Sequence, residues 1–147
     1  MRAIDDPITF TVLNELRVIE QLVNARLQRA LPHELELSHF AVLNQLSQSG
    51  GEKSPAQLAR AFQLTKGAMT NTTKRLAARG FIRSRDDATD GRKKLIAVTE
   101  AGRAVRDDAV AALTPVFAEI ADGVGREKLR DMLPLLRDLR IHLTEGE

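Results

Sequence analysis

The first amphipathic segment is too long to be covered by the core of one small domain, and this constrains the fold more than any other feature. Asp6 followed by Pro7 is a helix-start signal, because an aspartate caps free N–H groups and proline at the first helical position loses no hydrogen bond. Apolar residues then recur at spacings of three and four: Val12, Leu13, Leu16, Ile19, Leu22, Val23 and Leu27. The predicted helix over 7–31, closed by Pro32, would be ~37 Å long at roughly 1.5 Å per residue. We expect it to pack on a partner.

The C-terminal part of the chain is also predicted to form long amphipathic helices. Thr99 is expected to cap a fifth helix, with Pro115 kinking it and Gly123 and Gly125 breaking the chain after it. A last helix follows, and Pro134 predicts either a kink there or two separate pieces. The apolar stripes of the two helices are Val105, Ala109, Val110, Leu113, Val116, Phe117 and Ile120, then Leu129, Met132, Leu133, Leu136, Leu139 and Leu143.

The middle of the chain predicts short elements. A second helix starts at Ser38 and ends at Gly50-Gly51. Residues 54–57 read SPAQ, a capping box that opens a third helix, and Thr65 caps a fourth that ends at Arg79-Gly80. The short turn between the last two makes them a helix-turn-helix candidate. Two β-prone runs, 81–85 and 95–98, then predict a hairpin with a long polar loop over 86–94.

Composition excludes several classes of protein. The 147 residues contain no cysteine, which rules out disulfides, cysteine-ligated zinc and iron–sulfur clusters. No serine-hydrolase, nucleotide-binding or zinc-protease motif is present, so we expect no enzyme and no cofactor. No apolar run approaches the ~20 residues of a membrane-spanning helix, and the N-terminus lacks a signal peptide, so we expect a cytoplasmic protein.

Charge is unevenly distributed along the chain. The stretch 53–94 carries eleven basic and three acidic residues, a net +8, whereas the remainder is net −6 and the whole chain only +2. A basic middle between acidic ends indicates that the middle meets a polyanion. A solvated basic face is the simpler alternative for such a stretch taken alone.

The fourth helix carries the most informative pattern. At 100° per residue, one side is predicted to be buried: Ala68, Met69, Thr72 and Leu76. The opposite side offers a cation, an amide, a hydroxyl and a residue without a side chain: Gly67, Thr70, Asn71 and Lys74. A helix with such a surface fits the major groove of DNA, and Lys66 would add a phosphate contact. Any exposed helical face is polar, however, so this helix alone leaves both interpretations open.

The hairpin loop favours the DNA interpretation. It carries Arg92, Lys93 and Lys94 beside Gly91, and an arginine on such a projection enters the narrow, negatively charged minor groove. Asp90 would hold a nearby guanidinium and fix the shape of the loop. The candidate partners are Arg75, Arg79 and Arg85, and the sequence does not choose among them.

At these residues the chain resembles the MarR (multiple antibiotic resistance regulator) family. The resemblance rests on residues 80–92, GFIRSRDDATDGR, and residues 95–102, LIAVTEAG, with weaker support from SPAQLA at 54–59 and LTK at 64–66. It implies a mainly α fold with a small β-hairpin wing, as one domain over 1–147. Residues 34–98 would form the winged helix-turn-helix lobe, and residues 7–32 and 99–144 the dimerisation helices.

The resemblance also implies a function. It implies a sequence-specific, ligand-responsive repressor that binds a pseudo-palindromic operator in double-stranded DNA as a homodimer. Thr70, Asn71 and Lys74 would read or flank bases, Arg92 would enter the minor groove, and Asp90 would brace the wing. A small aromatic or phenolic effector would bind between the dimer helices and the DNA lobe. The chain departs from the family pattern at Thr72, Thr73 and Gly91.

Alternatives remain at this point. A metal site at His33, Glu34, Glu36 and His39 fits no standard ligand spacing, so a structural role is favoured and no metal is expected. His39 is a weak candidate for an effector pocket, and His142 is expected at the surface or a dimer interface. The rival function is a winged-helix module that binds an acidic protein without sequence-specific DNA recognition; the salt dependence and sequence preference of DNA binding would separate the two.

Overall fold

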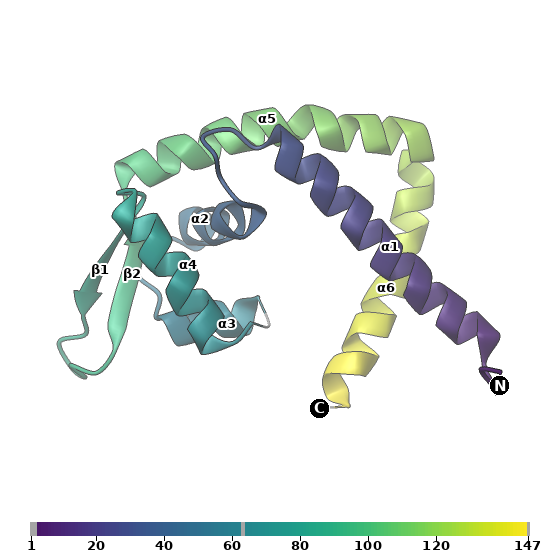
Figure 1. Cartoon of the computed structure of the whole chain (residues 1–147), viewed down its shortest axis with the longest axis horizontal. Coiled ribbons are helices and arrows are strands. Elements are labelled where there is room, and N and C mark those ends of the chain that lie inside the picture. Colours follow the sequence, from purple (N-terminus) through teal and green to yellow (C-terminus); the bar gives the residue numbers. More distant parts are fainter. Residues whose placement is uncertain (1–2, 63, 147) are drawn as a thin grey trace.

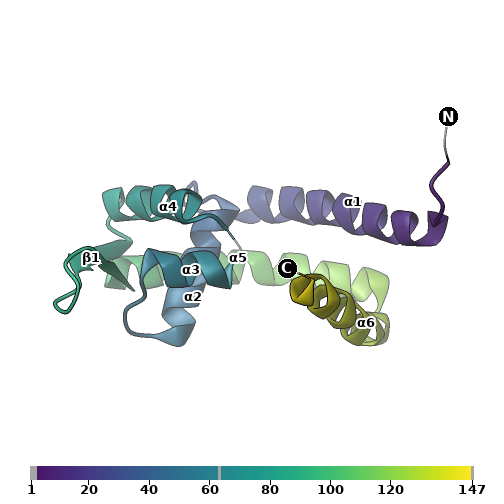
Figure 2. The ribbon, with the colours of Figure 1, turned by 90° about the horizontal axis from the view of Figure 1, so that it is seen from below.

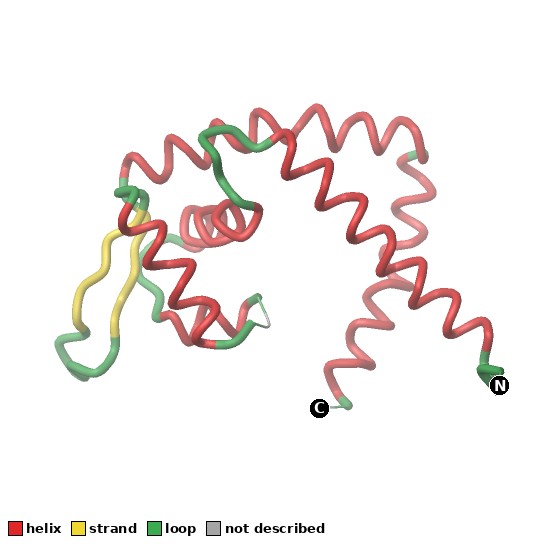
Figure 3. Tube along the Cα trace, in the orientation of Figure 1, coloured by secondary structure: helices red, strands yellow, loops and turns green. Residues whose placement is uncertain are grey.

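The chain forms six helices and one two-stranded antiparallel hairpin in a computed structural model that describes residues 3–62 and 64–146 (Figures 1 and 3). The elements are α1 Pro7–Ala30, α2 Leu37–Ser49, α3 Pro55–Ala61, α4 Lys66–Ala78, β1 Ile82–Asp86, β2 Lys94–Val98, α5 Glu100–Val124 and α6 Arg126–Glu145. The predicted fold class, a winged helix-turn-helix between long N- and C-terminal helices, is confirmed.

Short polar side chains start four of the helices where the sequence predicts them. In each case the side chain accepts a hydrogen bond from the N–H three residues later, which satisfies a donor that the helix leaves free. The capping residues are Asp6 of α1, Ser54 of α3, Thr65 of α4 and Thr99 of α5. These caps are local interactions, so the sequence pattern was sufficient to locate them.

Other helix boundaries differ from the prediction. Helix α2 begins at Leu37, not Ser38, after Glu36 as the N-cap residue. Pro115 and Pro134 each lie inside one uninterrupted helix, so α6 is not two pieces. Gly123 remains helical, and the chain turns only at Gly125, whose φ is 105°. A proline removes one backbone hydrogen bond, but the bonds of the turns on either side are enough to continue a long helix.

Each strand of the hairpin extends one residue further toward the connecting loop than predicted, and β1 starts at Ile82, one residue later than predicted. The register of the hairpin runs from Ile82 opposite Val98 to Asp86 opposite Lys94, so two residues assigned to the loop by sequence belong to the strands. Lys53, in the connection between α2 and α3, exchanges backbone hydrogen bonds of 2.8 and 2.9 Å with Ile96. The middle of β2 is thereby attached to the connection between α2 and α3.

One hydrophobic core joins α2, α3, α4, the hairpin and the first part of α5, and we call this unit the core lobe. Its most deeply buried side chains come from all these elements: Val42, Leu43, Leu46, Leu58, Met69, Leu76, Ile96 and Ala109. Leu35, from the loop between α1 and α2, joins them with 1% of its surface exposed. This packing fixes the hairpin and α4 on the same body.

The remaining helices extend away from the core lobe. Both views show α1 and α6 at the end opposite the hairpin (Figures 1 and 2). Helix α6 buries none of its residues, and α1 buries only Leu27. Large apolar side chains are exposed on both helices, among them Ile8, Phe10, Ile19, Leu22, Leu135, Leu136 and Leu143. Within the described ranges, no helix has the length and apolar character needed to span a membrane.

Candidate nucleic-acid interface

Helix α4 presents the polar strip that the sequence places on its outer side. Gly67, Asn71 and Lys74 are exposed and Thr70 is half-buried. An alanine Cβ built on Gly67 would meet no atom within 4 Å, so the helix backbone is open to an approaching molecule there. Asn71 therefore offers its amide, and Lys74 its ammonium, to the outside of the core lobe.

The inner side of α4 differs from the prediction. Met69 and Leu76 are buried as expected, but Ala68 is exposed and Thr72 only half-buried. Thr73 takes the third inner position, with 6% of its surface exposed. Its hydroxyl donates to the carbonyl of Thr70 at 3.0 Å, and this bond makes a buried threonine tolerable.

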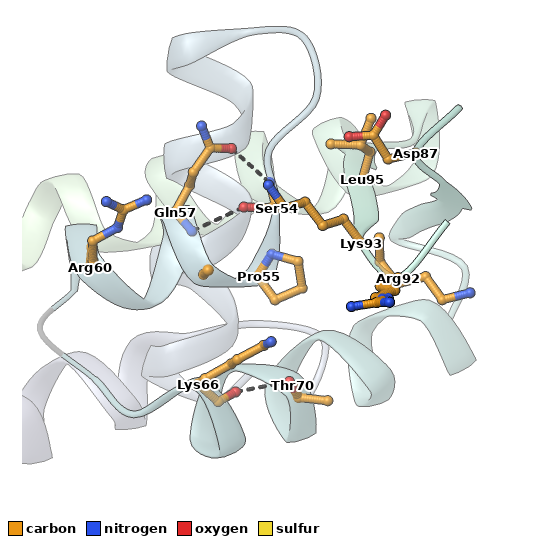
Figure 4. A pocket seen from close by; sticks show the side chains of 12 residues that line it. Ser54, Pro55, Gln57, Arg60, Lys66, Thr70, Asp87, Arg92, Lys93 and Leu95 are labelled. Carbon is orange, nitrogen blue, oxygen red and sulfur yellow. Dashed lines mark hydrogen bonds between the residues drawn. The ribbon is translucent and has the colours of Figure 1, made fainter. Parts of the chain in front are cut away.

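A groove lies between α3, α4 and the hairpin. Its cavity volume is 440 Å³. Cations from three elements and from the hairpin loop line it: Arg60 of α3, Lys66 of α4, Lys94 of β2, and Arg92 and Lys93 of the loop. Lys66 and Thr70 lie across this groove from Pro55 and Gln57, with Arg92 at its side (Figure 4). Asp87 is the acidic residue in the lining.

The structure thus brings most of the candidate residues together. Lys66, Thr70, Arg92, Lys93 and Lys94 share the groove. Lys74 lines a neighbouring cavity of 210 Å³ between α4 and the hairpin, where Thr70 and Lys94 also lie, and Asn71 lines neither. Arg60 also lines the groove but was not predicted as a site residue, although Arg60 belongs to the basic stretch 53–94. Its place in the groove depends on how α3 packs.

Hydrogen bonds within the loop give it a defined shape. The Asp90 carboxylate accepts from the Arg92 N–H at 3.1 Å, and the Asp90 carbonyl accepts from the Lys93 N–H at 3.0 Å. The Asp87 carboxylate accepts from the N–H of Thr89 at 3.0 Å and from its hydroxyl at 2.8 Å. These two bonds, with the charges of Lys93 and Arg85, lower the pKa of Asp87. A rigid loop holds its cations in place before any ligand arrives.

None of the three candidate arginines pairs with Asp90. Arg75 lies 3.7 Å from Glu36, Arg85 lies 2.8 Å from Glu52, and Arg79 donates to the carbonyl of His33. Asp90 fixes the loop through backbone N–H groups instead, because each of these arginines is held by a residue from an earlier part of the chain.

Two loop cations remain available to a polyanion. Lys94 pairs with Asp86 on the opposite strand at 2.5 Å. Within residues 3–62 and 64–146, neither Arg92 nor Lys93 has a carboxylate within 4.0 Å. The groove therefore concentrates positive charge from the loop and the helices on one face, where it raises the local concentration of anions.

The histidines near the start of α2 have structural partners. His33 pairs with Asp108 of α5 at 2.7 Å, and His39 accepts a hydrogen bond from the Glu36 N–H at 3.4 Å. The described part of the chain contains no group of three or more His, Cys, Asp or Glu side chains placed to hold a metal ion. His39 is buried, and this burial lowers its pKa below the usual 6.5, against the opposing charge of Glu36.

We expect His39 to make the fold sensitive to acid. Because its pKa is lower when folded than when unfolded, its contribution to stability is fully present above about pH 6.5 and is lost as the pH falls through the folded pKa. His39→Gln should therefore flatten the decrease in the urea unfolding midpoint between pH 7.5 and 5. His142→Gln, on the exposed surface of α6, should retain the wild-type decrease. An unchanged slope in the His39 variant would exclude this role.

Known proteins share this fold. The family model described as MarR family matches residues 33–93. A MarR-family transcriptional regulator from Rhodococcus is 25% identical over 95% of this chain and 97% of its own, with a TM-score of 0.77. A mutant of MarR from E. coli, solved with operator DNA, is 20% identical over 88% and 96% (TM-score 0.75). PcaV from Streptomyces coelicolor, solved with its natural ligand, is 20% identical over 95% and 97% (TM-score 0.78).

Proposed function

We propose that the protein is a homodimeric repressor of the MarR family that binds a specific DNA operator. The match of residues 33–93 to the MarR family model and the shared fold of its winged-helix regulators support this proposal. The observation that carries the proposal is the groove in which Lys66 and Thr70 of α4 lie beside Arg92 of the wing. The protein acts in the cytoplasm by binding, without catalysing a reaction.

In the proposed complex, α4 enters the major groove. Thr70, Asn71 and Lys74 then face base edges, and Gly67 allows the helix backbone to approach the duplex. Arg92 enters the adjacent minor groove, where the negative potential is concentrated. Lys66, Lys93, Lys94 and Arg60 contact phosphates, which position the protein without reading sequence.

The proposed dimer explains the exposed apolar surface of α1 and α6. Soluble monomers rarely leave large contiguous apolar patches in water, and a second copy of the chain would cover them. Two-fold symmetry then places two α4 helices on the same side of a duplex. The operator is accordingly a pseudo-palindrome whose half-sites lie about one helical turn, ~10 bp, apart.

A small aromatic or phenolic effector is part of the proposal, in analogy with PcaV and its ligand. An apolar cavity of 200 Å³ between α2 and α4, lined in part by Val42, Phe62 and Met69, offers room beside the recognition helix. His39, on α2, is not part of the lining of this cavity, and a contact between His39 and an effector is proposed from the sequence alone. A panel of aromatic acids titrated against the protein–DNA complex identifies an effector as the compound that releases the DNA.

Asn71→Ala is expected to reduce sequence discrimination. If the Asn71 amide contacts one base, its loss costs about 1–3 kcal/mol at that base position and leaves other positions unchanged. Competition binding with single-base operator variants measures this. Gln48→Ala, which removes an exposed amide from α2, should leave the specificity profile intact. A uniform loss of affinity on all sequences would mean that Asn71 does not read a base.

Arg92→Ala is expected to weaken binding to all duplexes. Since one cationic contact is lost in each half of the dimer, the slope of log affinity against log salt should become less steep by about one unit per contact. Arg26→Ala, which removes an exposed arginine from α1, is the matched control and should keep the wild-type slope. A wild-type operator titration from the Arg92 variant would remove the wing from the mechanism.

The rival function is a winged-helix module that binds an acidic protein. The same groove would serve such a partner, because its cations do not distinguish phosphate from carboxylate. Purified protein that shows no preference among DNA sequences at moderate salt would favour this alternative over the proposed repressor.

A further inference from the structure

The loop between α1 and α2 contacts two helices that are distant in the sequence. The Nε2 atom of His33 lies 2.7 Å from the Asp108 carboxylate on α5. The carbonyl of the same residue accepts a hydrogen bond of 2.5 Å from the guanidinium of Arg79, directly after the last turn of α4. His33 thereby joins the C-terminal end of α4 to α5, the long helix that leaves the core lobe.

The loop itself is held firmly. The side-chain amide of Gln28 on α1 donates to the Leu35 carbonyl at 2.7 Å and accepts from the Leu37 N–H at 2.9 Å. Leu35 is inserted into the core, with 1% of its surface exposed. His33 and Glu34 have φ values of 59° and 55°, a left-handed conformation that only a well-determined loop maintains in residues other than glycine. Because the loop is held firmly, a shift of α5 at Asp108 would also shift Arg79 at the end of α4.

The C-terminal end of α4 is attached at further points. The Arg79 guanidinium stacks 4.7 Å above the centre of the Phe81 ring, and Arg75 lies 3.7 Å from Glu36 of the loop. Gly67 and Asn71 of the exposed strip lie nearer the N-terminal end of α4, where Lys66 and Thr70 line the groove. A change at the attached end would therefore tilt the strip relative to α5.

We propose that His33, Asp108 and Arg79 form a junction that positions α4 relative to α5 and thereby determines the half-site spacing that the dimer accepts. This inference rests on the proposed function. Because α5 leads from the core lobe toward α6, the angle between α4 and α5 decides how far apart two recognition helices lie in a dimer. The His33 and Asp108 side chains are 43% and 61% exposed, and such exposed pairs add little to fold stability. Variants of this pair can therefore change the position of α4 relative to α5 without unfolding the protein.

The test uses Asp108→Ala and His33→Asn, since asparagine tolerates the left-handed backbone of this position. Asp107→Ala is the matched control: it removes the same charge from the neighbouring residue, which pairs with Arg106 of its own helix at 3.0 Å. Fluorescence anisotropy measures the affinity of each protein for selected operators with the native half-site spacing and with spacings one and two base pairs shorter or longer.

The junction predicts a change in spacing preference. The wild type and Asp107→Ala should both prefer the native spacing, whereas Asp108→Ala and His33→Asn should reduce that preference by about threefold to tenfold, the scale of a modest coupling. Asp108→Glu, which retains the carboxylate, should restore it. Melting temperature and dimer mass should stay unchanged in every variant.

Two outcomes overturn the inference in distinguishable ways. Junction variants that keep the wild-type ratio between native and altered spacings show that the junction does not position α4. A wild-type protein that binds no duplex with sequence preference refutes the proposed function itself, and the inference with it.

Discussion

Gly102→Ala is expected to unfold the core lobe at a markedly lower temperature than the wild type. A Cβ at this position would lie 2.0 Å from the carbonyl oxygen of Phe81 and 2.9 Å from a methyl group of Val98. Since the closest atom belongs to the backbone, it cannot rotate away, and α5 must shift from the base of the hairpin. Overpacking of this kind costs about 3 kcal/mol, or roughly 10 °C in melting temperature for a chain of this size.

The same contact explains why a glycine follows Thr99 by three residues. The Thr99 N–H donates to the Phe81 carbonyl at 3.0 Å, and its hydroxyl donates to the Gly80 carbonyl at 2.6 Å. These bonds draw the first turn of α5 against the start of the hairpin, where only glycine fits. Thr99 and Gly102 together therefore hold the hairpin against the start of α5.

Gly123→Ala is the matched control for this prediction. Gly123 lies in the same helix, and a Cβ there would meet no atom within 4 Å. Because alanine favours the helix more than glycine does, this variant should be as stable as the wild type or up to about 1 kcal/mol more stable. Differential scanning calorimetry on both variants decides the matter; equal melting temperatures would contradict the close contact at Gly102.

Leu135→Asp is expected to weaken dimerisation strongly and, with it, operator binding. Leu135 is 70% exposed in the single chain, so an aspartate there costs little for the folding of one protomer. In the proposed dimer the carboxylate would have to enter an apolar interface, which costs about 3 kcal/mol or more and weakens association by roughly 100-fold. Analytical ultracentrifugation measures the dissociation constant, and anisotropy the DNA affinity.

Leu135→Met controls for the loss of shape alone. It keeps an apolar side chain of similar volume and should dimerise within a fewfold of the wild type. A Leu135→Asp protein that remains dimeric at micromolar concentration would place the interface elsewhere on the exposed apolar surface of α1 and α6.

Local chemistry made most of the fold predictable from the sequence. Caps such as Ser54 and Thr65 act on backbone groups three residues away, and the β-prone runs 81–85 and 95–98 locate both strands to within one residue. These signals need no knowledge of tertiary structure. The order of helix, turn, helix and hairpin follows from them.

The details that the sequence did not reveal depend on packing between distant segments. Met69 and Leu76 fit two rotations of α4, and only the packed core selects the one that buries Thr73 and exposes Ala68. Arg75, Arg79 and Arg85 were all reasonable partners for Asp90, but residues of the α1–α2 loop and the residue before Lys53 hold them instead. Competition of this kind has no sequence signature.

The most direct test of DNA reading by α4 and the wing is a selection of bound duplexes from a random oligonucleotide pool. We predict enrichment of a two-fold symmetric motif with half-sites ~10 bp apart. The selected duplex should bind at least about 1,000-fold more tightly than the unselected pool at physiological salt. A pool that stays random after repeated rounds, or a selected duplex that binds no more tightly than the starting pool, would contradict this prediction.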